Sequence, residues 1–193
     1  MKILIKILTL LLISTFSTQL WALTCGGLPT YDREASVSPA QLCDVGLGNP
    51  DADDIGSIFG TTPSWTEVGE FTGAGTSTYF SVSVTSGAFG SSPVSGAWTV
   101  DSSFWATYTE AVISMHVGNG GGDPDYFAFL LEDDASSGTW RYEILQGNGG
   151  GLSNLKLWGR TTYVVTEPAS LALIGLGLVC LGLSRRRNSV EVL

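Results

Sequence analysis

The chain has little of the chemistry on which most enzymes and nucleic-acid-binding proteins depend. Its 193 residues include one histidine, three cysteines, and only nine lysines and arginines together. The single imidazole, His116, has no Gly-x-Ser-x-Gly elbow to accompany it. The alternation of residues around it places His116 on the strand face opposite Ile113 and Met115, which is typical of an ordinary strand residue. We therefore expect no catalytic activity.

Basic residues are scarcest in the middle of the chain. Residues 23–165 contain sixteen acidic side chains and four basic ones, for a net charge of −12. The four are Arg33, Arg141, Lys156 and Arg160. A domain this acidic repels the phosphate backbone and anionic surfaces, so we expect no nucleic-acid partner. Cations, basic partners and neutral glycans stay open, and an acidic surface also keeps an exported protein soluble.

The N-terminus has the pattern of a secretory signal peptide. Lys2 and Lys6 precede an apolar stretch, residues 7–13, and a more polar region ends at Ala22. Residues 1–22 are therefore predicted to be a signal peptide that is cleaved near Ala22, although Leu20 is larger than the usual residue three positions before the cut. A lipoprotein signal is the alternative because Cys25 follows closely, but Thr24 fits poorly before it.

Cys25 and Cys43 are the only cysteines in the exported part of the chain. In an oxidising compartment two such thiols are expected to form a disulfide. A metal site needs more ligands than two distant cysteines and one histidine supply. Closing this loop contributes about 3 kcal/mol in the chain-entropy model.

Residues 23–64 are rich in proline and glycine and have few periodic apolar positions. We interpret them as an irregular, disulfide-containing segment with one helical turn near residues 39–44. Within it, oxygen ligands at near-alternate positions suit a hard cation such as Ca²⁺. These are Asn49, Asp51, Asp53 and Asp54. The spacing fails as an EF-hand loop, and a solvated Asx-rich turn is the alternative to a calcium site. We expect no other cofactor.

From Trp65 onward the pattern changes to period two. Apolar residues alternate with polar ones around residues 80–85, 111–117, 140–145 and 155–157, and Gly/Ser/Asp/Pro connectors separate these runs. Residues 126–131 are apolar on both faces, as expected of a central strand. Residues 65–165 are therefore predicted to form an antiparallel β-sandwich, one ectodomain with residues 23–64. Two Gly-Asn-Gly-Gly-Gly stretches, at 118–122 and 147–151, are interpreted as hairpin connections.

Carboxylates and aromatic residues leave two further functions open. A carboxylate pair could perform glycoside chemistry. The acidic candidates are Glu110, Glu132, Asp133, Asp134 and Glu143. Exposed tryptophans could stack on sugar rings, although filling the core explains them equally well. The aromatic candidates are Trp65, Trp98, Trp105, Tyr108, Trp140 and Trp158.

The C-terminus combines three elements: Thr166-Glu167-Pro168, an uncharged run from 169 to 184, and three arginines. The run makes about 24 Å of helix against a bilayer core of about 30 Å, so it is a slightly short transmembrane helix. Arg185, Arg186 and Arg187 would stop transfer on the cytoplasmic side, with residues 188–193 as a cytoplasmic tail. Pro168 disfavours helix at Glu167, which leaves an extended segment for a protease.

Residues 166–187 resemble the PEP-CTERM sorting signal of Gram-negative bacteria. The family pattern is Pro-Glu-Pro-Ala-Ser, a Leu/Gly-rich helix and an arginine cluster, and this chain departs from it only at Thr166. The resemblance implies export, anchoring in the inner membrane, and processing by an exosortase-type enzyme that releases the protein to the cell surface or exterior. It also implies a β-rich, jelly-roll-like ectodomain.

The leading hypothesis is thus a non-enzymatic surface or extracellular matrix protein that associates with exopolysaccharide. A carbohydrate- or calcium-binding sandwich is the first alternative, and a glycoside-active enzyme is the second.

Overall fold

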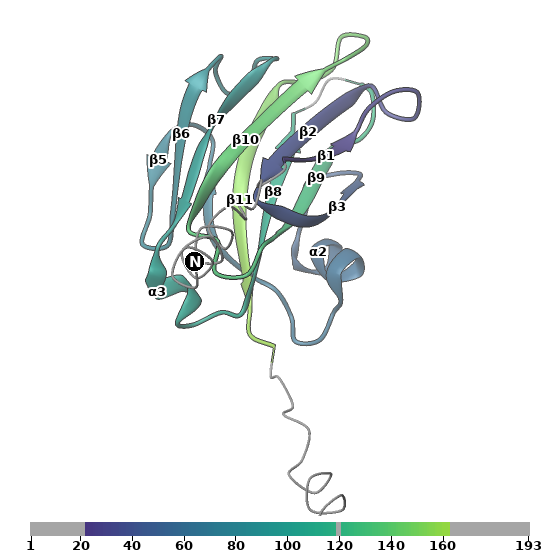
Figure 1. The fold of residues 1–193 in the computed structure, drawn as a ribbon. Coiled ribbons are helices and arrows are strands. Elements are labelled where there is room, and N and C mark those ends of the chain that lie inside the picture. The colour runs from purple at the N-terminus through teal and green to yellow at the C-terminus, as the bar shows by residue number, and fades with distance from the viewer. Residues whose placement is uncertain (1–21, 119–120, 163–193) are drawn as a thin grey trace, which may run out of the picture. The chain divides into compact units, whose positions relative to one another are not determined.

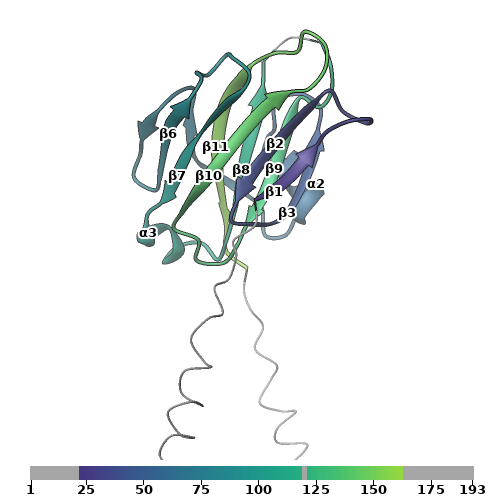
Figure 2. The same ribbon diagram turned by 45° about the horizontal axis from the view of Figure 1, so that its top comes forward.

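The computed structural model describes residues 22–118 and 121–162, which form two antiparallel sheets and two short helices (Figures 1 and 2). Sheet A has, in spatial order, β1 (Leu23–Gly26), β2 (Arg33–Ser38), β10 (Ser137–Ile144), β7 (Val94–Val100), β6 (Phe80–Ser86) and β5 (Gly75–Thr76). Sheet B has β3 (Ala40–Gly46), β9 (Tyr126–Leu131), β8 (Glu110–Val117), β11 (Leu152–Arg160) and β4 (Thr66–Phe71). The prediction of a two-sheet, antiparallel fold is confirmed. Its jelly-roll-like description stays a prediction.

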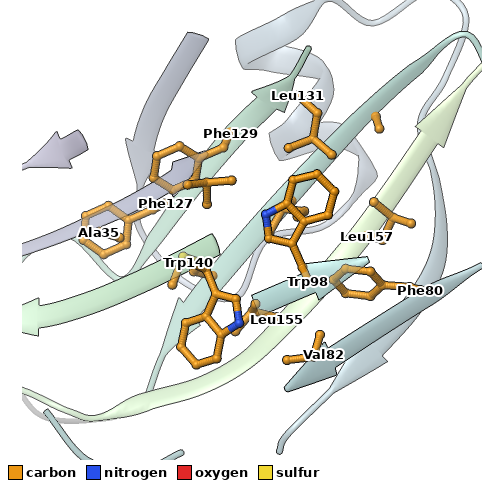
Figure 3. Packing of buried hydrophobic residues seen from close by; sticks show 14 of the residues in the cluster. Ala35, Phe80, Val82, Trp98, Phe127, Phe129, Leu131, Trp140, Leu155 and Leu157 are labelled. Atoms are coloured by element: carbon orange, nitrogen blue, oxygen red, sulfur yellow. The ribbon is translucent and has the colours of Figure 1, made fainter. Parts of the chain in front are cut away.

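The main core lies between the two sheets. Trp98 and Trp140 point inward from sheet A and meet Phe129, Leu155 and other apolar side chains of sheet B (Figure 3). The alternation predicted for β6, β8 and β10 is observed, because every second side chain faces this core. Burying one large apolar side chain contributes about 2 kcal/mol, so this layer supplies most of the driving force for folding.

A second apolar layer covers the outer face of sheet B. Helix α2 (Ala52–Phe59) places Ile55 against Val112, Ala128 and Trp158. Strand β9 therefore has apolar residues on both faces, since one face meets the main core and the other meets this second cluster. The prediction that residues 126–131 form an inner strand is confirmed, because β9 lies between β3 and β8.

The prediction that residues 23–64 are irregular was wrong. They contribute β1 and β2 to sheet A and β3 to sheet B, and α2 follows. The helical turn expected near residues 39–44 is part of strand β3. The inward positions of β2 include Ala35 and Val37, which are small. Buried and exposed positions therefore alternate regularly in the structure, but the hydrophobicity of the sequence shows this alternation only weakly. The prolines and glycines mark the ends of short elements rather than the absence of elements.

Helix α2 begins at a well-formed N-cap. The Asp51 carboxylate accepts hydrogen bonds from the backbone N–H groups of Asp53 and Asp54, and the Asp54 carboxylate accepts one from the N–H of Asp51. This reciprocal capping box contributes on the order of 1 kcal/mol to helix stability. Gly60 ends the helix at φ +100°, a conformation that favours glycine.

Four predicted segments lie wholly or almost wholly outside the described residues: the signal peptide 1–22, the sorting signal 166–187, its transmembrane helix 169–184 and the tail 188–193. Within residues 22–118 and 121–162, no helix is long and apolar enough to cross a membrane.

Candidate functional site

Three glycine-containing connections meet at one end of the sandwich. The N–H of Gly90 donates to the carbonyl of Leu152 (2.7 Å), and the N–H of Gly118 donates to the carbonyl of Gly151 (3.0 Å). A Cβ at position 151 would lie 2.1 Å from the Gly90 carbonyl, so the two backbones approach too closely for any other residue. Glycine is therefore required here by backbone contact between loops.

These loops border an uncharged hollow of about 330 Å³. Its lining residues are Thr72, Phe89, Gly90, Gly118, Gly150, Gly151, Leu152 and Ser153. Phe89 is held in place by an edge-on contact with Trp140, with ring centroids 5.7 Å apart. The lining has hydroxyl and backbone polar groups but no side chain that titrates near neutral pH. It suits a small neutral group and offers no acid, base or metal ligand.

Arg33 holds this end of the sandwich together from beneath. Its side chain is 1% exposed, its Nη1 donates to the Pro124 carbonyl (2.9 Å), and its Nη2 donates to the Gly121 carbonyl (3.3 Å). Asp125 lies 3.8 Å from the guanidinium and balances its charge. The sequence does not predict this role for Arg33. The one usable signal is that Arg33, one of four basic residues in 23–165, shares the alternating positions of Ala35 and Val37.

Tyr142 ties a second loop to the same end. Its buried hydroxyl donates to the Gly150 carbonyl at 2.6 Å. Burial raises the pKa of Tyr142 to about 12, against a smaller opposing effect of Arg33.

The stretch 147–151 joins β10 of sheet A to β11 of sheet B, so its interpretation as a hairpin connection was wrong. The stretch 118–122 does connect a hairpin, β8 and β9.

His116 lies on the outer face of sheet B, opposite Ile113 and Met115, as predicted. It sits between Asn154 of β11 and Tyr126 of β9 in one cross-strand row. Burial lowers the pKa of His116, Lys156 adds to this effect, and Asp125 and Glu70 oppose it. Burial, with nearby aspartates, raises the pKa of Tyr126 to about 12. The row is neutral at pH 7, which fits a structural role for the imidazole.

Three of the five candidate carboxylates have separate partners, and the other two are exposed. Glu110 forms an ion pair with Arg160, and Glu143 forms one with Arg141. Asp133 accepts a hydrogen bond from the Gln41 side chain (3.3 Å). Glu132 and Asp134 are exposed in the connection after β9. Of the five, Glu110 and Glu143 lie in different sheets, on β8 and β10.

One carboxylate pair does face across strands. Glu34 of β2 lies directly opposite Glu143, and both contact Arg141. The cleft beside them has a volume of about 30 Å³, room for about one water molecule rather than a sugar ring. In this conformation the two carboxylates share the Arg141 guanidinium.

The tryptophans fill the core rather than forming a sugar platform. Trp65, Trp98, Trp140 and Trp158 are each at most 3% exposed. Trp105 is half-buried and donates to the Ala135 carbonyl (3.1 Å), and Tyr108 is half-buried against Phe104. The sequence left two roles open for these residues, stacking on sugar rings and filling the core, and the structure shows core filling. Among the described tryptophans, only Trp105 is partly exposed.

The oxygen-rich stretch, residues 49–54, contains the N-terminal cap of helix α2. Asp51 and Asp54 form the reciprocal cap, which is an Asx-type turn at the start of a helix. Asn49 precedes it and Asp53 is exposed in the first turn. Among residues 22–118 and 121–162, no group of three histidine, cysteine or acidic side chains is placed to hold a metal ion. Calcium binding here stays an untested prediction.

The predicted disulfide is present. Cys25 of β1 bonds to Cys43 of β3, which joins an edge strand of sheet A to an edge strand of sheet B. The bond closes a sequence separation of 18 residues. It therefore cross-links the two layers at β1, an edge strand of four residues.

Comparison with known proteins identifies the C-terminal segment. Residues 164–187 match the PEP-CTERM protein-sorting motif. The match includes Thr166, Glu167 and Pro168 and the arginine cluster 185–187, so the predicted resemblance is confirmed. No curated protein and no solved structure matches the chain. The motif implies an exported precursor that is anchored in the membrane before exosortase-type processing. The described residues of this chain form a disulfide-linked β-rich fold.

Proposed function

We propose that the mature protein is a non-enzymatic surface or extracellular matrix protein that associates with exopolysaccharide. The observation that carries the proposal is the sorting motif at residues 164–187. A signal peptide over residues 1–22 starts export, the helix 169–184 anchors the precursor in the inner membrane, and Arg185–Arg187 remain cytoplasmic. Processing next to Glu167-Pro168 then frees the ectodomain for the cell surface or exterior.

A non-catalytic role agrees with the chemistry of the described surface. The hollow at the glycine loops has no acid or base in its lining. The facing carboxylates Glu34 and Glu143 share Arg141 beside a cleft of about 30 Å³. His116 is half-buried in a neutral cross-strand row. These features support a binding or structural protein better than they support a glycoside-active enzyme.

The test is cell fractionation of a producing strain. Wild-type protein should be recovered with the exopolysaccharide matrix, and Pro168→Ala should shift it to the inner-membrane fraction because processing fails. Glu191→Ala, beyond the arginine cluster, is the matched control and should fractionate as wild type. Recovery of wild-type protein only in culture medium free of polysaccharide would reject matrix association.

A second candidate is a module that binds one specific ligand, a carbohydrate or calcium. The uncharged hollow beside Phe89 favours the carbohydrate version. The calcium version depends on Asn49, Asp51, Asp53 and Asp54 and is tested by thermal unfolding. A rise of the melting temperature in millimolar Ca²⁺ that Asp53→Asn abolishes would support a site, and an unchanged melting temperature would reject it.

A further inference from the structure

The outer face of sheet A is covered by small hydroxyl side chains. Strand by strand, the outward positions of β6, β7, β10 and β2 are exposed or half-buried, while the alternate positions fill the core. With those of the edge strands β1 and β5, the outward hydroxyl residues are Thr24, Ser36, Ser38, Thr76, Ser81, Ser83, Thr85, Ser86, Ser95, Thr99, Ser137 and Thr139. The only apolar side chain among these outward strand positions is Ala97, so the face has no aromatic or large aliphatic group.

Strand register aligns these hydroxyls into rows that cross the sheet. One row runs Ser81, Thr99, Ser137, a second runs Ser83, Ala97, Thr139, Ser38, and a third runs Ser95, Arg141, Ser36, Thr24. Neighbouring strands are about 4.8 Å apart, so adjacent hydroxyls of a row lie at about that spacing. Ala97 interrupts the second row and Arg141 interrupts the third, and the other side chains in the rows are short.

The hydroxyls retain hydrogen-bonding capacity toward a ligand. Ser83 Oγ donates to the Ala97 carbonyl and Thr85 Oγ1 donates to the Ser95 carbonyl, both at 3.3 Å. A hydroxyl has one donor and two acceptor sites, so each of these oxygens can still accept. Ser81 and Thr99 also line a hollow of about 300 Å³, whose wall is rich in serine and threonine and includes Asp101.

Charge is nearly absent from this face although the ectodomain is strongly acidic. Its three charged strand residues, Glu34, Arg141 and Glu143, contact one another. The acidic residues gather instead on the sheet B side, where Asp44, Asp53, Asp54, Glu67, Glu70 and Glu110 lie on β3, α2, β4 and β8. A soluble surface usually mixes charges of both signs, so a wide uncharged face departs from that pattern.

We propose that the outer face of sheet A binds a neutral polysaccharide chain laid across its hydroxyl rows. The inference rests on the proposed association with exopolysaccharide and names the surface and the class of ligand. The hydroxyls can both donate to and accept from the hydroxyls of a sugar chain, and the one basic side chain of the face, Arg141, is already paired with Glu34 and Glu143, which leaves an anionic polymer little to bind. A second copy of the protein is a poorer occupant because protein interfaces require apolar or aromatic anchors, which this face lacks.

The experiment uses the protein secreted by producing cells and two probes, the neutral and anionic fractions of the same cells' exopolysaccharide. Binding is measured by co-sedimentation. Thr139→Arg places a bulky charge at the centre of the face, between Ala97 and Ser38. Thr66→Arg makes the same change at an exposed position of β4 and serves as the matched control. Both variants must keep the wild-type melting temperature.

We expect wild type and Thr66→Arg to bind the neutral fraction, and Thr139→Arg to bind at least tenfold more weakly. Removing hydroxyls without changing shape, in the variant Ser81→Ala, Thr99→Val, Thr139→Val, should weaken binding about tenfold or more, since each hydrogen bond contributes on the order of 1 kcal/mol. Undiminished binding by Thr139→Arg, binding lost instead in Phe89→Ala, or binding confined to the anionic fraction would overturn the assignment. If wild type binds neither fraction, the proposed association itself fails.

Discussion

Trp140 of β10 lies directly opposite Gly96 of β7, and its indole occupies the space that a side chain at position 96 would need. The relationship is reciprocal, because Trp98 lies opposite Gly138 and its ring covers that glycine in the same way. Two directly opposed tryptophan–glycine pairs thus lie side by side in sheet A, and their tryptophans, Trp98 and Trp140, belong to the main core (Figure 3). The glycines are required for this packing as much as the tryptophans.

Substituting Gly96 with alanine tests this packing. The added Cβ would lie 1.8 Å from the Ser83 carbonyl oxygen and 2.6 Å from the Trp140 ring, and neither can yield without moving the sheet. We expect a loss of about 3 kcal/mol in the free energy of unfolding, measured by chemical denaturation. Gly73→Ala is the matched control, since nothing lies within 4 Å of its Cβ, and it should leave stability within about 1 kcal/mol of wild type. Equal effects of the two substitutions would contradict the packing account.

Removing the hydroxyl of Tyr142 tests the tie between β10 and the loop that follows it. Tyr142→Phe leaves the buried Gly150 carbonyl without its 2.6 Å donor, which should cost about 1–3 kcal/mol. The raised pKa of Tyr142, about 12, means that its contribution is present below pH 10 and is lost as pH rises toward 12. We would measure the free energy of unfolding of wild type and Tyr142→Phe by chemical denaturation at pH 7 and pH 11. The difference between the two proteins should be smaller at pH 11.

The titration of His116 predicts a mild acid sensitivity. Burial and Lys156 lower its folded pKa, against Asp125 and Glu70, so the unfolded chain binds a proton first. The contribution of neutral His116 to the free energy of unfolding should therefore be fully present above about pH 6.5, the pKa of histidine in the unfolded chain. It should fall as pH decreases below that value. His116→Gln should flatten the stability profile between pH 7 and pH 5. A profile as steep as wild type in that variant would exclude His116 as the cause.

The disulfide should matter mainly for stability. Replacing both Cys25 and Cys43 with serine removes the cross-link between β1 and β3 and should reduce the free energy of unfolding by about 3 kcal/mol. Cys180 lies in the sorting segment that the proposed processing removes, so the mature wild-type protein should have no free thiol by labelling under denaturing conditions. One or two reactive thiols in the secreted protein would show that the bond does not form.

Much of the fold could be predicted from the sequence because alternation was strong where large residues were involved. Strands β6 and β10 could be predicted from large apolar residues at every second position, Phe80 and Val82 in β6 and Trp140 and Tyr142 in β10. Strand β2 was missed because its buried positions hold Ala35 and an arginine. Helix α2 was missed because its capping aspartates looked like cation ligands, and eight residues give too short a pattern to read.

The sites were harder to predict, because they depend on which strands become neighbours. Arg33 contacts Pro124, 91 residues away, and no local pattern relates the two. Each hydroxyl row on sheet A joins three or four separate strands, so the rows exist only once register is set. The sorting motif was the opposite case, since its chemistry is contiguous in the chain and needs no tertiary structure to be recognised.

The central claim, export followed by removal of the sorting segment, is tested most directly by the intact mass of the native protein from producing cells. The account predicts a single chain that begins near Leu23, contains the Cys25–Cys43 disulfide and ends near Thr166. A native protein that still carries residues 167–193 wherever it is found, or that keeps its first 22 residues, would contradict it.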